Sequence, residues 1–212
     1  MTKQNISAQL FFLYDSHCPW SFVVTQLVNE INKAFPNITL NLWHTAFFDG
    51  KIPLNKKEIT NEIKEVEKLA NISFSKNYKE LANLNRNSIL VANLMTWAQN
   101  KTPNLALSLL NSIQAAHFEQ GEDLTTQSQL EKIINELKLS PPAKIFKNDK
   151  LSKDTLLQLE ECYALQEIIQ TEAIPALLLA VDEQLILLNH NFYLTQPSAI
   201  VEAVQLELNK YQ

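Results

Sequence analysis

Residues 10–24 constrain the fold of this chain more than any other stretch. An apolar run predicts a buried strand, three polar residues predict a tight connection, and the stretch from Cys18 predicts a helix. Pro19 suits the first helical position, because that position needs no backbone N–H donor and the proline ring fixes a helical φ. Apolar side chains recur at helical spacing until Pro36 ends the pattern. The chain therefore places a cysteine at the start of a helix that follows a buried strand.

The predicted position of Cys18 bears on its chemistry. The start of a helix presents unpaired N–H groups and the positive end of the helix dipole, which together favour a thiolate. A thiolate is the nucleophile of disulfide exchange and of glutathione chemistry. His17 is adjacent and adds positive charge if it is protonated. The alternative is a buried cysteine that only fills space, but the strand–turn–helix context favours a reactive thiol.

A second strand follows the first helix. Residues 38–44 alternate between apolar and polar side chains, and strand, helix and strand together predict a parallel pair with a right-handed crossover. His44 ends this strand. It could line a site near Cys18, but we favour a structural histidine whose hydrogen bonds are satisfied internally.

Residues 56–140 carry helical patterns only. One predicted helix runs from Pro103 to about Gln120, with Gly121 as its stop. His117 falls in the last turn of this helix, where a positive charge suits the dipole, so a capping or solvated side chain is the favoured interpretation.

The last third of the chain returns to mixed structure. Residues 152–170 predict an amphipathic helix that contains Cys162, which we expect to be inert core packing, with a resolving role against Cys18 as the less favoured alternative. Two apolar runs, 173–181 and 184–190, predict an antiparallel hairpin. A final helix is expected to open at Pro197.

Three stretches resemble one family. Residues 15–21, Asp-Ser-His-Cys-Pro-Trp-Ser, resemble the active-site turn of the DsbA-like branch of the thioredoxin fold, where Cys-Pro-x-Cys is usual and Ser21 here replaces the second cysteine. Residues 111–124 resemble the helical insertion of DsbA-like proteins and of 2-hydroxychromene-2-carboxylate isomerase-like proteins. Ile174–Pro175 resembles the dipeptide that holds the cis-proline of the fold.

The resemblance implies a fold and a site. The fold is an α/β thioredoxin fold, with a mixed central sheet in the order β-α-β then α-β-β-α and a DsbA-type all-helical insertion. Residues 1–50 and 151–212 are expected to form the thioredoxin-like domain, and residues 51–150 the insertion. The implied catalytic residues are Cys18, Ser21 and Pro175, and the implied substrate-binding residues are His17, Pro19, Trp20 and Ile174.

Three functions are compatible with this motif. The favoured one is a thiol-disulfide oxidoreductase that acts through Cys18 alone, on a protein or small-molecule thiol or disulfide, with glutathione or another thiol resolving the mixed disulfide. The second is a glutathione-dependent isomerase or transferase. The third is a catalytically silent binding protein with the same fold. None implies a permanently bound cofactor or a metal.

Composition excludes several other classes. The net charge of −5 and a pI near 5.4 give no electrostatic reason to bind nucleic acid or an anionic membrane. No apolar run approaches the length of a membrane span, and residues 1–8 have no signal-peptide pattern, so a cytoplasmic protein is expected. The chain has only two glycines, which excludes a glycine-rich phosphate-binding loop. Oligomeric state cannot be predicted from this pattern.

Overall fold

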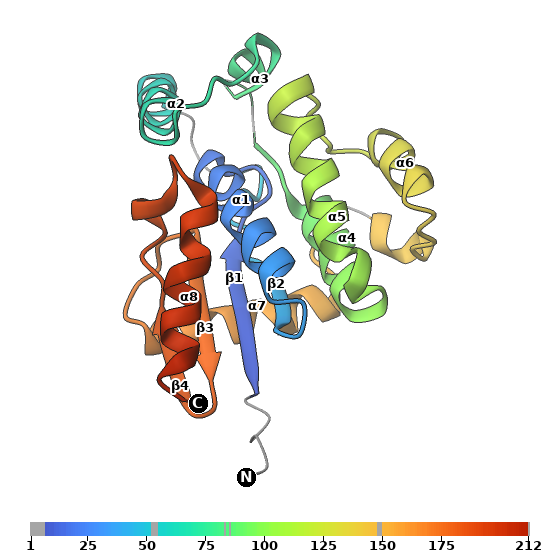
Figure 1. The fold of residues 1–212 in the computed structure, drawn as a ribbon. Helices are drawn as coiled ribbons and strands as arrows, with labels where there is room; N and C mark the ends of the chain where they lie inside the picture. Colours follow the sequence, from blue (N-terminus) through green and yellow to red (C-terminus); the bar gives the residue numbers. More distant parts are fainter. Residues whose placement is uncertain (1–6, 52–54, 83, 85, 148–149, 212) are drawn as a thin grey trace.

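A computed structural model describes residues 7–51, 55–82, 84, 86–147 and 150–211. Four strands form one sheet in the order β2-β1-β3-β4 (Figure 1). The strands are β1 (Ala8–Tyr14), β2 (Thr39–His44), β3 (Ala176–Val181) and β4 (Gln184–Leu187). β1 runs parallel to β2 and antiparallel to β3, and β4 is antiparallel to β3. The predicted βαβ unit and C-terminal hairpin are both confirmed.

Helices cover the two faces of the sheet (Figure 1). Alternation along β1 sends Leu10 and Phe12 toward the face packed by α1 (Pro19–Ala34) and α8 (Ile200–Asn209). Phe11 and Leu13 point to the other face, which α7 (Lys153–Ile168) covers. Pro197 opens a short 3-10 turn (Pro197–Ala199) from which α8 continues. The sheet is therefore buried on both sides, as its apolar sequence requires.

The chain between β2 and α7 is helical. It contains α2 (Lys56–Ala70), α3 (Lys76–Leu81), α4 (Ile89–Lys101), α5 (Pro103–Gln114), α6 (Gln127–Glu136) and the 3-10 turn η2 (Ala143–Phe146). The element after α5 is a π-helix, η1 (Ala115–Gln120), and Gly121 ends it with φ of 78°. The predicted stop at Gly121 is confirmed, whereas α3 was not predicted. A Cβ on Gly121 would overlap Asn77, so the glycine also allows η1 to approach α3 closely.

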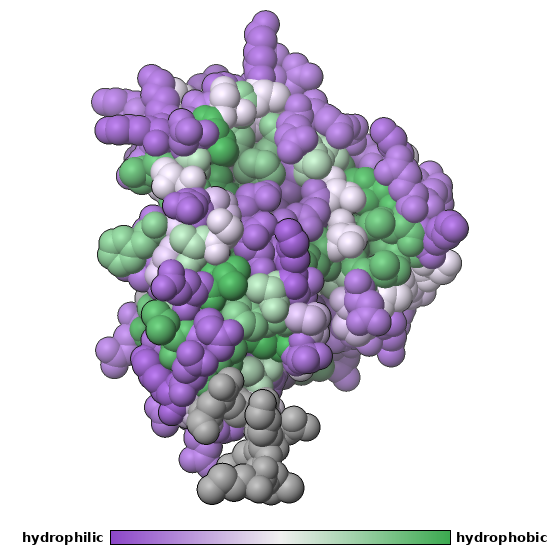
Figure 2. Space-filling model, in the orientation of Figure 1, coloured by the Kyte–Doolittle hydropathy of each residue, from purple (hydrophilic) through white to green (hydrophobic). Residues whose placement is uncertain are grey.

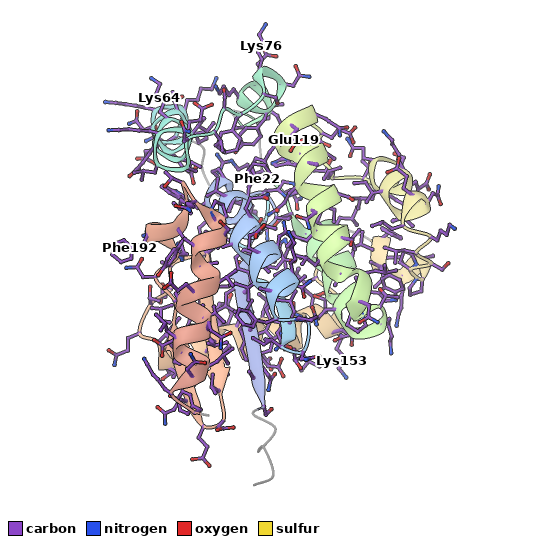
Figure 3. All side chains as sticks on the ribbon, viewed as in Figure 1. Phe22, Lys64, Lys76, Glu119, Lys153 and Phe192 are labelled. Atoms are coloured by element: carbon purple, nitrogen blue, oxygen red, sulfur yellow. The ribbon has the colours of Figure 1, made fainter. Side chains whose placement is uncertain are left out.

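The insertion helices pack against the start of α1. Phe22 of α1 meets Phe118 of η1 at a ring-centroid distance of 4.7 Å and Phe74, in the segment before α3, at 5.9 Å. Figure 3 labels Phe22 between the upper end of α1 and the helices above it. Tyr78 of α3 joins the same aromatic cluster, 4.7 Å from Phe118. The end of the sheet at which β1 leads into α1 is thus covered by helices of the insertion.

Helix α4 also contacts the sheet, along the outer strand β2. The side-chain amide of Gln99 donates to the carbonyl of Leu40 at 3.1 Å and accepts from the N–H of Leu42 at 3.0 Å. These two bonds satisfy backbone groups on the side of β2 that faces away from β1.

The surface mixes polar and apolar side chains. Figure 2 shows hydrophilic residues over much of one face, with smaller hydrophobic areas between them. Within the described part of the chain, no helix combines the length and the apolar character that crossing a membrane demands.

Candidate active site at the start of helix α1

Cys18 is the residue that precedes α1, with φ of −86° and ψ of 121°. Its N–H donates to the carbonyl of Asp15 and its own carbonyl accepts from Phe22, each at 3.1 Å. Pro19 takes the first helical position, as predicted. The cysteine is only 4% exposed, because the turn lies under the insertion helices. The sequence therefore predicted the position of this thiol correctly, but not its burial.

Ser21 lies one turn into α1, and its N–H and hydroxyl influence the Cys18 thiol. Burial is the largest influence on Cys18 and raises its pKa to about 12, while hydrogen bonds from the N–H and hydroxyl of Ser21 lower it. The carboxylates of Glu62 and Asp15 act in the same direction as burial. The expectation that the helix start favours a thiolate is therefore wrong for this closed arrangement, because desolvation outweighs the donors that the helix supplies. The Ser21 hydroxyl also accepts from the N–H of Asp15 at 3.3 Å.

Asp15 ties the cysteine turn to two other parts of the chain. One carboxylate oxygen accepts from the N–H of His17 at 2.8 Å. The other accepts from the hydroxyl of Ser88 at 2.7 Å and from the N–H of Phe48 at 3.1 Å. The side chain is fully buried, so these bonds replace the water that it loses. Asp15 thereby fixes the turn against the start of α4 and the loop after β2.

His44 is a structural histidine, as favoured from the sequence. The N–H of Ala46 donates to its Nδ1 and the N–H of Ser16 donates to its Nε2, each at 3.0 Å, and Nε2 also lies 2.9 Å from the hydroxyl of Ser16. Burial lowers the pKa of His44 to about 4, although the carboxylate of Asp15 opposes the shift. The ring is therefore neutral at physiological pH and holds the turn in place.

His17 continues this chain of hydrogen bonds. Its Nδ1 lies 2.9 Å from the Ser16 hydroxyl, and its Nε2 lies 3.0 Å from the carbonyl of Asp123. Burial lowers the pKa of His17, so it adds no positive charge beside Cys18 at neutral pH. Both ring nitrogens are occupied within the fold.

His117 packs against His17, with ring centroids 4.0 Å apart. Its Nδ1 lies 2.8 Å from the carbonyl of Glu122. Burial lowers its pKa well below the usual value, and the neighbouring His17 acts in the same direction. The expectation of a solvated or positively charged cap is therefore wrong: the side chain is buried, neutral and next to the cysteine turn.

Further polar groups surround this turn. Arg86 donates to Glu62 with both terminal nitrogens at 3.3 Å and lies 4.9 Å from the centre of the Phe48 ring. The hydroxyl of Tyr78, the Nε of Arg86 and the Nε2 of His117 are buried without a hydrogen-bond partner among the described residues. Sequence reasoning missed Ser88, Tyr78 and Arg86. Only Arg86 carried a signal, since it is the one arginine in the chain.

The peptide bond between Ile174 and Pro175 is cis, the geometry that the sequence predicted. The register of β1 and β3 pairs Leu13 with Ala176, which brings Pro175 next to the end of β1. Pro175 is buried and Ile174 is partly exposed. Trp20 is half-buried at the start of α1. These residues lie at the end of the sheet from which the cysteine turn leaves.

Cys162 lies elsewhere. It is fully buried in α7 and packs with Leu13 and Leu178 on the opposite face of the sheet from α1. Both cysteines are free. The predicted role of Cys162 in core packing matches this position, and no disulfide joins it to Cys18.

The strand order, the cysteine at the start of the helix after β1 and the proline before β3 define a thioredoxin fold with an all-helical insertion. The chain belongs to the DSBA-like thioredoxin domain family, whose profile matches residues 9–155. A search of curated proteins gave no match.

Solved structures share this fold. The cytosolic disulfide reductase DsbM from Pseudomonas aeruginosa superposes with a TM-score of 0.81 at 19% identity, covering 95% of this chain and 98% of that one. The same reductase with GSH gives 0.79 at 18% identity, covering 95% and 99%. A 2-hydroxychromene-2-carboxylate isomerase gives 0.57 at 13% identity, covering 95% and 96%. Both branches named from the sequence thus appear among the structures with this fold.

Proposed function

We propose that this protein is a thiol-disulfide oxidoreductase that acts through the single thiol of Cys18. The observation that carries the proposal is the placement of Cys18 at the start of α1, where the N–H and hydroxyl of Ser21 act to lower the pKa of its thiol. These two donors are available to stabilise negative charge on sulfur whenever the thiol ionises or leaves. Membership in the DSBA-like family supports disulfide chemistry in general.

The reaction needs two exchanges. The Cys18 sulfur attacks one sulfur of a disulfide, so a mixed disulfide with Cys18 forms, and the other half leaves as a thiol with the proton that Cys18 gave up. A glutathione thiol then attacks the mixed disulfide. This step releases the Cys18 thiol and forms a disulfide between glutathione and the first half of the substrate. A second glutathione then attacks this disulfide and releases the first half of the substrate as a thiol. In total, two glutathione thiols are oxidised to one disulfide for each substrate disulfide that is reduced.

Glutathione is the proposed resolving thiol, because Ser21 cannot resolve the adduct and Cys162 lies on the other face of the sheet. The disulfide reductase DsbM has been solved with GSH and shares this fold. Its cytosolic location is consistent with a cytoplasmic location for this chain, which is part of the proposal.

The remaining site residues receive roles within this proposal. Pro175 and Ile174 contact the substrate backbone beside the reacting sulfur, while Pro19 and the half-buried Trp20 border the cysteine. His17 acts differently, since both its ring nitrogens are bonded inside the fold. It shapes the turn and forms one wall of the site.

Mass spectrometry after incubation with oxidised glutathione tests the proposal. The wild-type protein should gain one glutathione on Cys18, and reduced glutathione should remove it. A Cys18→Ser variant should gain none, while a Cys162→Ala variant should behave like wild type. The absence of a Cys18 adduct at any pH up to about 9 would overturn the proposal.

A second experiment uses the position of Ser21. A Ser21→Cys variant places two thiols one helical turn apart, so it should close a local disulfide and reduce a test disulfide without added glutathione. The matched control is the double variant Cys18→Ser with Ser21→Cys, which keeps the new thiol but lacks its partner. Equal activity of the two variants would contradict the assigned site.

One observation favours the glutathione-dependent isomerase or transferase alternative. The raised pKa of Cys18 keeps the thiol protonated at neutral pH, and a protonated thiol is a poor nucleophile. In that alternative the protein would bind reduced glutathione without forming an adduct. Calorimetric titration with reduced glutathione, together with the absence of the adduct above, would identify it. If glutathione neither binds nor forms an adduct, the non-catalytic binding protein is the remaining interpretation.

A further inference from the structure

A cavity of about 890 Å³ lies at the same end of the sheet as Cys18, on the side of α7. It is lined by the loop after β2, the last turns of α7 and the loop that leads to Pro175. Thr45 of the first loop bonds through its N–H to the carbonyl of Tyr14 at 2.7 Å, directly before the cysteine turn. Phe48, which follows the lining residue Phe47, bonds to Asp15 at 3.1 Å. The cavity wall is therefore joined to the turn that holds Cys18.

The charge of the cavity is negative. Asp49, Glu167 and Glu172 line it, and no lysine or arginine is among the described lining residues. Asp49 has a partner, since the exposed ammonium of Lys51 lies 3.6 Å from it. Glu167 and Glu172 form no ion pair with any described residue. Two carboxylates are thus available to a positively charged group.

Two aromatic rings form apolar parts of the same wall. Phe47 is 53% exposed and Tyr163 is 61% exposed, which is high for rings of this size. Aromatic faces attract cations, and arginine stacks on them as well. Carboxylates beside exposed rings therefore match an alkylammonium or guanidinium group better than a neutral one.

The amide of Gln166 adds an independent acceptor. Gln166 lines the cavity and is only 8% exposed. Its Nε2 donates to the carbonyl of Glu172 at 3.1 Å, and its Oε1 accepts from no described group. The C-terminal end of α7, which carries the negative end of a 16-residue helix dipole, forms the same wall. An unpaired amide oxygen and a helix C-terminus both favour a donor with positive charge.

We propose that this cavity binds a lysine or arginine side chain of a peptide whose disulfide reacts at Cys18. An extended peptide advances about 3.3–3.6 Å per residue. Ile174 lines the cavity and precedes Pro175, which lies beside the end of β1 that leads into the cysteine turn. The volume is within the range of sites that hold side chains and small ligands, about 300–1,000 Å³. This inference rests on the proposed function for the disulfide, but the cation site itself requires only the cavity.

Two peptides test the inference. Each is a short peptide in mixed disulfide with glutathione, and one has arginine a few positions from the cysteine where the other has citrulline, which is neutral and nearly isosteric. Formation of the Cys18 adduct is followed by mass spectrometry. We expect the arginine peptide to react about tenfold faster at about 20 mM salt, and about twofold faster at about 500 mM, because salt screens the attraction.

Matched variants locate the effect. The double variant Glu167→Gln with Glu172→Gln should lose the preference for arginine, whereas Glu160→Gln with Glu161→Gln should keep it. Both pairs are exposed, and both remove two negative charges from α7 or the loop after it. Only the first pair lines the cavity. The comparison therefore separates a local site from the attraction of a chain with a net charge of −5.

Binding is measured in parallel, by fluorescence anisotropy of labelled peptides that carry serine in place of cysteine. Tighter binding of the arginine peptide, lost in the lining double variant, supports the site even if no adduct forms, and the missing adduct then overturns only the proposed function. Equal reaction and equal binding of the two peptides overturn the cation site. A preference that both double variants lose to the same extent also overturns it.

Discussion

The two cysteines of this chain are buried to nearly the same extent, yet their surroundings differ. Cys18 is 4% exposed and Cys162 is 0% exposed, and burial raises the pKa of each to about 12. The N–H and hydroxyl of Ser21 act to lower the pKa of Cys18, whereas the pKa of Cys162 is lowered only by a bond within its own residue. Burial and the pKa are alike for the two thiols, so what differs between them is the donors around the sulfur.

The wider surroundings of the two cysteines also differ. Asp15, His17 and His44 tie the turn of Cys18 to three separate segments through buried polar bonds. Cys162 packs among aliphatic and aromatic side chains between α7 and the sheet. Formation of the first region removes water from many polar groups, and each of these groups needs a hydrogen-bond partner within the fold. The second region is apolar packing, which has no such requirement.

Removal of each thiol should give the largest contrast. Cys18→Ala should lower the rate of mixed-disulfide formation with oxidised glutathione by at least about 100-fold, because the nucleophile is gone. Cys162→Ala should change that rate by less than about twofold and cost about 1–2 kcal/mol of stability from the lost packing. Stopped-time mass spectrometry and urea unfolding measure the two effects. Loss of the adduct in Cys162→Ala would break the comparison.

Alkylation of the wild-type protein should distinguish the thiols next. We expect iodoacetamide to label Cys18 about tenfold faster than Cys162 near neutral pH, because two groups of Ser21 favour a thiolate on Cys18, whereas Cys162 has only the bond within its own residue. Peptide mapping after timed labelling gives both rates in one sample. Faster labelling of Cys162 would show that access through α7 matters more than the donors at α1.

The role of the Ser21 hydroxyl is the third test. Ser21→Ala removes one donor to the sulfur, so the pKa of Cys18 should rise and its alkylation at pH 8 should slow about fivefold. The control Thr25→Val removes a buried hydroxyl of the same helix that bonds to the carbonyl of Ser21 and not to sulfur. Equal rates in Ser21→Ala and wild type would show that the backbone N–H alone supports the thiol.

Acid should destabilise the two cysteine regions to different extents, and this is the smallest of the predicted effects. The pKa of His44 is about 4 in the folded state and 6.5 when the turn opens, so the open state binds the proton first as pH falls below 6.5. Between pH 7 and pH 6, opening of the Cys18 turn should increase about threefold from His44 alone. Amide hydrogen exchange, corrected for intrinsic rates, should show a loss of protection around residues 15–18 and not in α7. An equal loss in α7 would contradict the assignment.

At alkaline pH the two cysteines should affect stability in the same way. Each thiol has a pKa of about 12 when folded and 9 as a free group, so unfolding releases protons between these values. Stability should therefore be lost as pH rises from about 9 toward 12 in wild type. This makes the acid response the one that distinguishes the regions.

The sheet, the cysteine turn and the proline before β3 could be predicted because each depends on local pattern. Apolar alternation and Pro19 define the first strand and helix, and Gly121 ends its helix as expected. The state of the Cys18 thiol could not be predicted, since it depends on burial by helices that lie 38 or more residues away, α2 and α3. A local helix dipole suggested a thiolate, and long-range desolvation reversed it.

The histidines show the same limit. The hydrogen bonds of His44 lie within the turn and its own strand end, so the structural interpretation was accessible from the sequence. His117 depends on contact with His17, 100 positions away, which no spacing rule indicates. Ser88 and Tyr78 were missed for the same reason, as ordinary residues that become important only where the chain returns to the turn.

The bonds of Gln99 to β2 have a consequence for association between molecules. An outer strand with free N–H and carbonyl groups can add a strand from another chain, which is a common start of aggregation. On β2 the amide of Gln99 already engages the carbonyl of Leu40 and the N–H of Leu42. Strand addition is thereby discouraged at this edge, and the short β4 at the other end is left as the edge where a second chain could pair.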